Sequence, residues 1–60
     1  MNRIREVATE KQIKIEQIIR NTGIAKSSMY QIINSEYEPS VTKALKIAKA
    51  LGSTVEELFV

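Results

Sequence analysis

The chain of 60 residues contains no cysteine, no histidine and no tryptophan, and all seven of its acidic residues are glutamates. The absence of cysteine excludes a disulfide bond and a thiol nucleophile. Without cysteine, histidine and aspartate, the usual ligand sets for zinc and calcium cannot be assembled. So short a chain also leaves little room for a catalytic pocket. We therefore expect no metal, no cofactor and no enzymatic activity.

Long apolar runs are absent as well. No stretch approaches the roughly 18 residues of a membrane span, and no apolar signal-peptide core follows Met1. The hydrophobic content of 43% and the charged content of 27% are those of a globular protein. We expect a cytoplasmic protein that does not contact membranes.

Charge is modest and unevenly distributed, with a formal net charge of +2. Residues 1–33 hold six lysines and arginines against three glutamates, whereas residues 34–60 hold three against four. The basic first half is a weak indication of an acidic partner, and the small numbers also fit chance. A domain of this size buries only about 60% of its unfolded surface. With disulfides and metals excluded, either good packing or a partner chain must stabilise it.

Apolar residues recur at helical spacing along the chain, although its nine isoleucines favour strands by propensity. The first helix is expected from about Arg3 to Lys11, with Asn2 as its cap. The second should end at Gly23, and the third should begin near Ala25 or Ser27 and end at Asn34-Ser35. The apolar stripes of these three helices are Ile4, Val7 and Ala8; Ile15, Ile18, Ile19 and Thr22; and Met29, Ile32 and Ile33.

A loop containing Pro39 separates these helices from two more. Ser40 is a good cap for a fourth helix that stops at Gly52, and Thr54 with Glu57 forms a capping-box pattern that opens a short fifth. Their expected apolar positions are Val41, Ala44, Leu45, Ile47, Ala48 and Leu51, and then Val55, Leu58 and Phe59. Five short helices with short connections predict one compact all-α domain over residues 1–60.

The informative piece is the connection between the second and third helices. It consists of roughly four residues around Gly23-Ile24, the length of the turn in a helix-turn-helix unit. Such a unit places its second helix in the major groove of DNA.

The residues now support a more specific comparison. The segments that carry it are Ile18-Ile19, Gly23-Ile24, Met29 with Ile32, Pro39-Ser40, residues 45–52, and Glu57-Leu58-Phe59. Together they resemble the Cro/C1-type (xenobiotic-response-element) helix-turn-helix family over nearly the whole chain. The resemblance implies a five-helix, lambda-repressor-like fold. It also implies a bacterial or phage DNA-binding regulator, most often a repressor, that binds its operator as a dimer.

Several positions depart from the family pattern. Lys14-Ile15 stands where members commonly have a capping serine and a phosphate-contacting glutamine, and Ile15 cannot donate a hydrogen bond to a phosphate. Ala25 replaces a frequent capping residue of the third helix, and Ser35 replaces a frequent glycine. Ala8 and Ile33 are apolar where some members pair arginine with glutamate, and apolar packing can replace a buried ion pair without loss of stability.

The third helix is the expected reader of DNA sequence. Its polar side carries Lys26, Ser27, Tyr30, Gln31 and Asn34. The resemblance assigns base contacts to Lys26, Ser27 and Gln31, whose side chains suit guanine or adenine edges. Tyr30 can contact a thymine methyl group, a sugar or a phosphate, or it can be a half-buried structural residue. The alternative for the whole face is an ordinary solvated helix surface.

Phosphate contacts position such a protein without reading sequence. The candidates are Lys14, Ser28, Asn34, Tyr37, Ser40 and Lys43. Glu36 and Glu38 argue against this interpretation of the loop, because they would repel DNA unless they point away. Lys46 and Lys49 continue the spacing of Lys43 but fit a solvated face better.

The C-terminal residues concentrate apolar surface. Leu58 is expected to close the core, while the resemblance implies a homodimer interface formed by Val55, Leu58, Phe59 and Val60. We therefore expect a dimeric regulator that binds double-stranded DNA, with no small-molecule effector. The alternative is a protein-interaction module, such as an antirepressor or antitoxin-like subunit, that retains the fold with weak DNA binding. The low net charge, Ile15 and the two loop glutamates favour that alternative.

Overall fold

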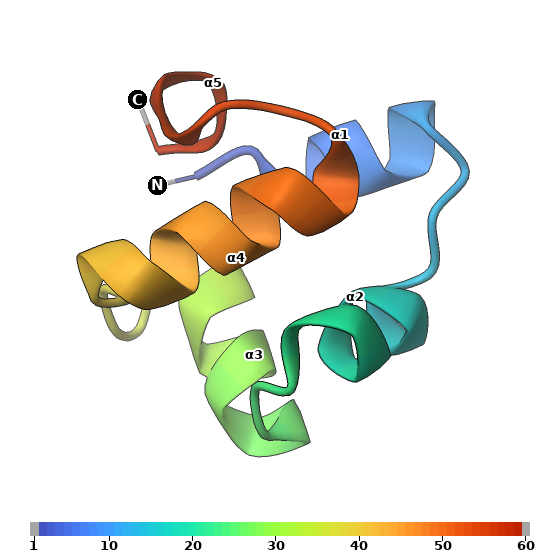
Figure 1. Cartoon of the computed structure of the whole chain (residues 1–60). Helices are drawn as coiled ribbons and strands as arrows, with labels where there is room; N and C mark the ends of the chain where they lie inside the picture. The colour runs from blue at the N-terminus through green and yellow to red at the C-terminus, as the bar shows by residue number, and fades with distance from the viewer. Residues whose placement is uncertain (1, 60) are drawn as a thin grey trace.

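The computed structural model describes residues 2–59, and over this range the chain forms five α-helices and no strand. They are α1 (Ile4–Glu10), α2 (Ile15–Thr22), α3 (Lys26–Ile33), α4 (Val41–Leu51) and α5 (Val55–Leu58). In Figure 1, α4 crosses the middle of the molecule, with α1 and α5 on one side of it and α2 and α3 on the other. The predicted all-α, five-helix fold is confirmed.

One apolar core draws side chains from all five helices. Ile24, in the turn between α2 and α3, is also buried there. The largest side chains with almost no exposed surface are Ile4, Ile18, Met29, Ile32, Ile47, Leu51 and Leu58. These are isoleucine-rich positions at helical spacing, so the pattern that predicted the helices also predicted most of the core.

The prediction was wrong for two residues of α4. Val41 and Leu45 were expected on its apolar stripe, but they are 76% and 56% exposed. The helix instead packs inward through Ala44, Ile47, Ala48 and Leu51. Because these four residues already cover the face that α4 turns to the core, Val41 and Leu45 lie outside it.

Side-chain hydrogen bonds stabilise the N-terminal ends of several helices. The Ser40 hydroxyl accepts a hydrogen bond from the Lys43 amide at 3.3 Å, which caps α4. Thr54 and Glu57 form the predicted capping box at the start of α5, with each side chain accepting from the other's amide. The prediction of Asn2 as the cap of α1 was wrong, because Arg3 occupies the cap position and its side chain accepts no bond there. Asn2 lies one residue earlier, and its side-chain oxygen accepts a hydrogen bond from the Ile4 amide at 3.1 Å. The helix is one residue shorter at each end than predicted.

The C-terminal ends of α2, α3 and α4 are each followed by a left-handed residue. Gly23 occupies such a position after α2, as predicted, with φ of 73°. Gly52, where α4 was predicted to stop, is left-handed as well, with φ of 63°. Ser35 does the same after α3 with φ of 60°, and its amide donates to the Ile32 carbonyl. The chain thus turns at Ser35 in the way that a glycine would allow.

Three long-range ties attach the first helix to the rest of the molecule. The Asn2 amide group donates to the Ile32 carbonyl at the end of α3 at 2.7 Å. The Lys11 ammonium donates to the carbonyls of Leu51 and Gly52 at the end of α4, both at 2.8 Å. The Arg3 amide donates to the Leu58 carbonyl. These bonds fix the frame that presents α2 and α3.

Candidate nucleic-acid interface

The connection between α2 and α3 is short and internally bonded. It comprises only residues 23–25. The Thr22 hydroxyl is buried, donates to the Ile18 carbonyl at 2.8 Å and accepts from the Ile24 amide at 3.3 Å. Gly23 takes the left-handed conformation, and Ile24 inserts into the core. The angle between the two helices is therefore set by packing, as a helix-turn-helix unit requires.

The two sides of α3 differ sharply. Met29, Ile32 and Ile33 face the core, as predicted. The opposite side exposes Lys26, Ser27, Gln31 and Asn34, while Ser28 and Tyr30 are partly buried. The Tyr30 ring packs against the core, so part of its surface has a structural role. Four polar side chains on one exposed side of a rigid helix can reach the edges of bases.

The N-termini of α2 and α3 lack side-chain caps. Lys14 and Ala25 occupy the cap positions and neither accepts a hydrogen bond there. The first amides of an uncapped helix need partners and carry partial positive charge, which suits a phosphate oxygen. By contrast, α4 and α5 use their caps. The two helices of the helix-turn-helix unit thus begin without a side-chain cap, as α1 also does at Arg3.

Packing explains the departures noted at Ile15, Ala8 and Ile33. Ile15 is half-buried and packs against the core, so it stabilises the start of α2 and offers nothing to a phosphate. Ala8 and Ile33 are both buried, at 2% and 7% exposure. Apolar packing between α1 and α3 therefore occupies the place of an ion pair.

A second polar group lies between α3 and α4. The Lys43 ammonium donates to the Tyr37 hydroxyl at 3.0 Å and lies 5.6 Å from the centre of the Tyr37 ring. Ser40, which caps α4, is in the same segment. Glu36 and Glu38 are exposed in this loop as well, so its electrostatic field is mixed.

Arg5 was not among the predicted contacts. It lies on α1, yet it lines one surface hollow together with Lys14, Lys26 and Tyr30. The sequence held only an indirect signal, because Ala8, one turn further along α1, matches a position where some family members carry an arginine that pairs with the third helix.

The C-terminal candidates separate into different environments. Leu58 is fully buried within the chain, so it belongs to the core and has no surface to offer a second subunit. Val55 and Phe59 are partly exposed, and Val60 lies outside the described residues. Val55 lines one hollow with Val41 and another with Leu45. We call the continuous face formed by Val41, Leu45, Val55 and Phe59 the α4–α5 apolar surface.

Two further features of residues 2–59 bear on the site. None of the helices in this range combines the length and apolar character needed to cross a membrane. No three histidine, cysteine, aspartate or glutamate side chains in it come together in a way that could hold a metal ion.

Comparisons with known proteins agree with this geometry. The family model of the Cro/C1-type HTH DNA-binding domain matches residues 3–60. An uncharacterized HTH-type transcriptional regulator of Methanocaldococcus jannaschii is 31% identical over 45 residues, which cover 75% of this chain and 68% of that protein. A second, from Archaeoglobus fulgidus, is 28% identical over 58 residues, covering 97% of this chain and 83% of the relative. No solved structure matches the chain.

Proposed function

Because the chain belongs to the Cro/C1-type helix-turn-helix DNA-binding family, we propose that it is a sequence-specific transcriptional regulator that acts as a repressor. Residues 1–60 would act as one DNA-binding domain in the cytoplasm, with α3 in the major groove of a pseudo-palindromic operator. The observation that carries this proposal is the exposed polar side of α3, held by a turn that Thr22 and Gly23 fix. The names of both relatives are in line with it.

Base reading is assigned to residues of α3. Lys26 would donate to O6 or N7 of guanine, and Gln31 would pair with N6 and N7 of adenine. Ser27 can donate to or accept from either base. Tyr30 would contribute only the exposed part of its ring and its hydroxyl.

Phosphate contacts would flank α3 on both sides. Lys14 lies at the start of α2 on one side, and Asn34, Tyr37, Ser40 and Lys43 lie between α3 and α4 on the other. Ser28 adds a partly buried hydroxyl. Since the Lys43 ammonium already contacts Tyr37, these two side chains would approach a phosphate as a unit.

Dimerisation would use the α4–α5 apolar surface. Val41 and Leu45 replace Leu58 in the proposed interface, since they are exposed and it is buried. A symmetric dimer would present two copies of α3 about 34 Å apart, one helical turn of DNA.

The test of base reading is a substitution of Gln31. Anisotropy titrations would compare DNA from upstream of the chain's own gene with a random duplex, at low and moderate salt. The wild type should prefer the upstream DNA, and Gln31→Ala should lose about 1–3 kcal/mol on that DNA alone. Gln17→Ala, an exposed glutamine of α2, is the matched control and should bind as the wild type does.

Two outcomes would count against the proposal. An equal loss on random DNA would show that Gln31 does not read bases. A wild type that does not distinguish upstream from random DNA would favour a protein-interaction module, such as an antirepressor or antitoxin-like subunit. The exposed Glu36 and Glu38 beside α3 are the features that favour this second candidate.

A further inference from the structure

The hollow between α1, the start of α2 and α3 gathers positive charge from three separate elements. Arg5 comes from α1, Lys14 precedes α2, and Lys26 begins α3. Glu16 is the acidic residue among those that line it, so the cations outnumber the carboxylate three to one. The hollow encloses about 330 Å³, which is ample for a phosphate group.

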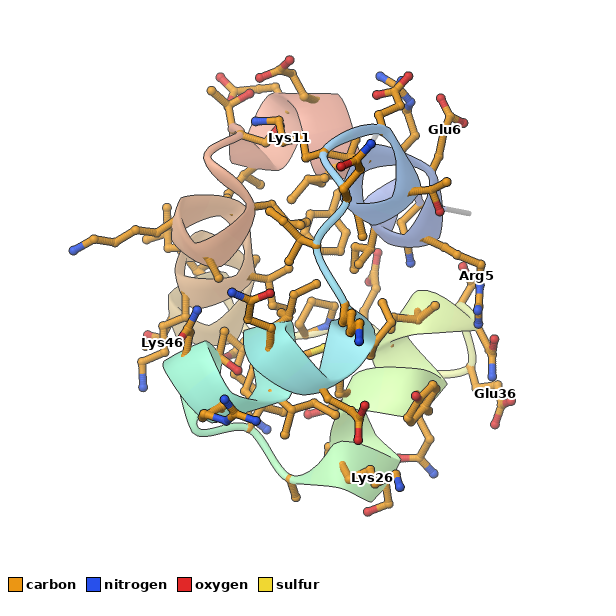
Figure 2. The ribbon with its side chains drawn as sticks, turned by 90° about the vertical axis from the view of Figure 1, so that its right-hand side faces the viewer. Arg5, Glu6, Lys11, Lys26, Glu36 and Lys46 are labelled. Carbon is orange, nitrogen blue, oxygen red and sulfur yellow. The ribbon has the colours of Figure 1, made fainter. Side chains whose placement is uncertain are left out.

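The side chain of Arg5 is available to a ligand. It is exposed, and within residues 2–59 the single ion pair joins Arg3 to Glu6, which leaves the Arg5 guanidinium without a carboxylate partner. Figure 2 shows Arg5 extending from α1 along one edge of the molecule, with Lys46 on the opposite side. Glu36 lies on the Arg5 side in that view, so the two charges share a region without forming an ion pair.

In the proposed complex with DNA, the hollow would lie at a wall of the major groove. A helix with its side chains is about 10–12 Å wide and fills a groove of about 12 Å, so residues flanking the helix face the two phosphate backbones. Lys26 reaches the bases from the start of α3 in the proposed complex, and the hollow lies directly beside it. A phosphate of the adjacent strand would therefore pass the mouth of this hollow.

From this arrangement we propose that the hollow seats one phosphate of the DNA backbone, and that Arg5 is a DNA-positioning residue supplied by α1. This inference rests on the proposed DNA-binding function and adds a contact to it. Ile15 cannot hydrogen-bond a phosphate at the start of α2, and Lys14 is a flexible point charge. The planar guanidinium of Arg5 can instead bind two phosphate oxygens at once. Lys14 and Lys26 then make the electrostatic potential at the hollow more positive.

The experiment measures how strongly binding depends on salt. Wild type, Arg5→Gln, Arg5→Lys and Lys46→Gln would be titrated against the upstream duplex and a random duplex, between about 50 and 200 mM salt. Each phosphate neutralised steepens the dependence of log K on log salt by about 0.9. Arg5→Gln should therefore lower the slope by about 1 for each subunit bound, and weaken binding by the same factor on both duplexes.

The controls separate a local contact from a general charge effect. Lys46→Gln removes the same charge on the opposite side of the molecule and should leave the slope near the wild-type value. Arg5→Lys keeps the charge and should restore most of the slope, although with weaker binding than arginine gives. Thermal unfolding of the four proteins should coincide, since Arg5 and Lys46 are exposed.

The possible failures are distinguishable. If the wild type shows no salt-dependent binding to either duplex, the proposed function fails and the Arg5 contact fails with it. If the wild type binds steeply but Arg5→Gln keeps the full slope, the Arg5 contact alone is refuted. Equal losses in Arg5→Gln and Lys46→Gln would refute it too, because net charge would then explain both.

Discussion

Within residues 2–59, four residues have a left-handed backbone, and two of these are glycines. Gly23 and Gly52 adopt it without steric cost, whereas Gln12 and Ser35 place a Cβ atom close to a carbonyl oxygen, with φ of 57° and 60°. At Ser35 the bonds that end α3 are all present, including that from the Glu36 amide to the Gln31 carbonyl at 2.8 Å. The turn therefore forms although Ser35 is not a glycine, and the steric strain at Ser35 lowers the stability of the fold.

Ser35→Gly should stabilise the fold. Relief of the left-handed strain, less the greater freedom of glycine in the unfolded chain, leaves a gain of about 0.5–1 kcal/mol. Thermal or urea unfolding would show it as a rise in Tm of several degrees. Asn34→Gly is the matched control, because Asn34 has φ of −83° and a glycine there should destabilise. A gain at Asn34 or a loss at Ser35 would contradict this account.

The residues that could be predicted from the sequence are those whose neighbours lie on the same helix. Spacing alone placed Met29, Ile32 and Ile33 inside and Gln31 outside, since a helix fixes which positions share a face. Exposure of Val41 and Leu45 depends on how α4 is rotated against the rest of the molecule. That rotation is set by contacts far away in the sequence, which no local pattern encodes.

Among the helices, α5 depends most on its cap. It has four residues, too few to form by propensity alone. Hydrogen bonds from the Thr54 hydroxyl and amide, followed by one from the Ser53 hydroxyl, lower the pKa of the Glu57 carboxyl below its ordinary value. The charged carboxylate is thus the form that the capping box favours.

This shift predicts an acid-dependent loss of stability. Because the pKa of Glu57 is lower in the folded than in the unfolded chain, its contribution is complete above the unfolded value of about 4.3 and disappears as the pH falls through the folded value. Glu57→Gln keeps a side-chain acceptor in the box but cannot titrate. Its unfolding free energy should fall less than that of the wild type over this acidic range.

Glu56→Gln is the control for the preceding prediction, since Glu56 is an exposed neighbour outside the capping box. Its stability should follow the acid dependence of the wild type. Urea unfolding at a series of pH values from neutral to acidic would decide. If the unfolding free energies of wild type and Glu57→Gln fell in parallel with pH, the Glu57 carboxylate would not be the cause of the acid-dependent loss.

On the scale of the whole molecule, the α4–α5 apolar surface stands out because it leaves apolar side chains exposed to solvent. A leucine that becomes fully buried contributes about 1.5–3 kcal/mol, and a symmetric dimer would bury Leu45 twice. Leu45→Lys should therefore weaken self-association by about tenfold or more, while the fold persists because Leu45 is 56% exposed. Sedimentation over a range of concentrations would measure it.

Thr42→Lys adds the same charge to an exposed neighbour on α4 and should leave association unchanged. The dimer proposal fails if the wild type remains monomeric at high concentration. It also fails if both lysine variants behave alike. The sequence located apolar residues near the C-terminus but not this surface, because Val41 and Leu45 join Val55 and Phe59 only through the packing of α4 against α5.

The ties made by Asn2 and Lys11 have a consequence for folding. They join residues 30 to 41 positions apart. Bringing such distant residues together costs conformational entropy before the stabilising contacts form. The segment around α1 can therefore dock only on an assembled α3 and α4, and once docked it hinders either from opening alone. The chain should therefore be either fully folded, with its DNA-reading surface complete, or unfolded. In the unfolded state it is exposed to proteases. Its cellular abundance would then follow its global stability.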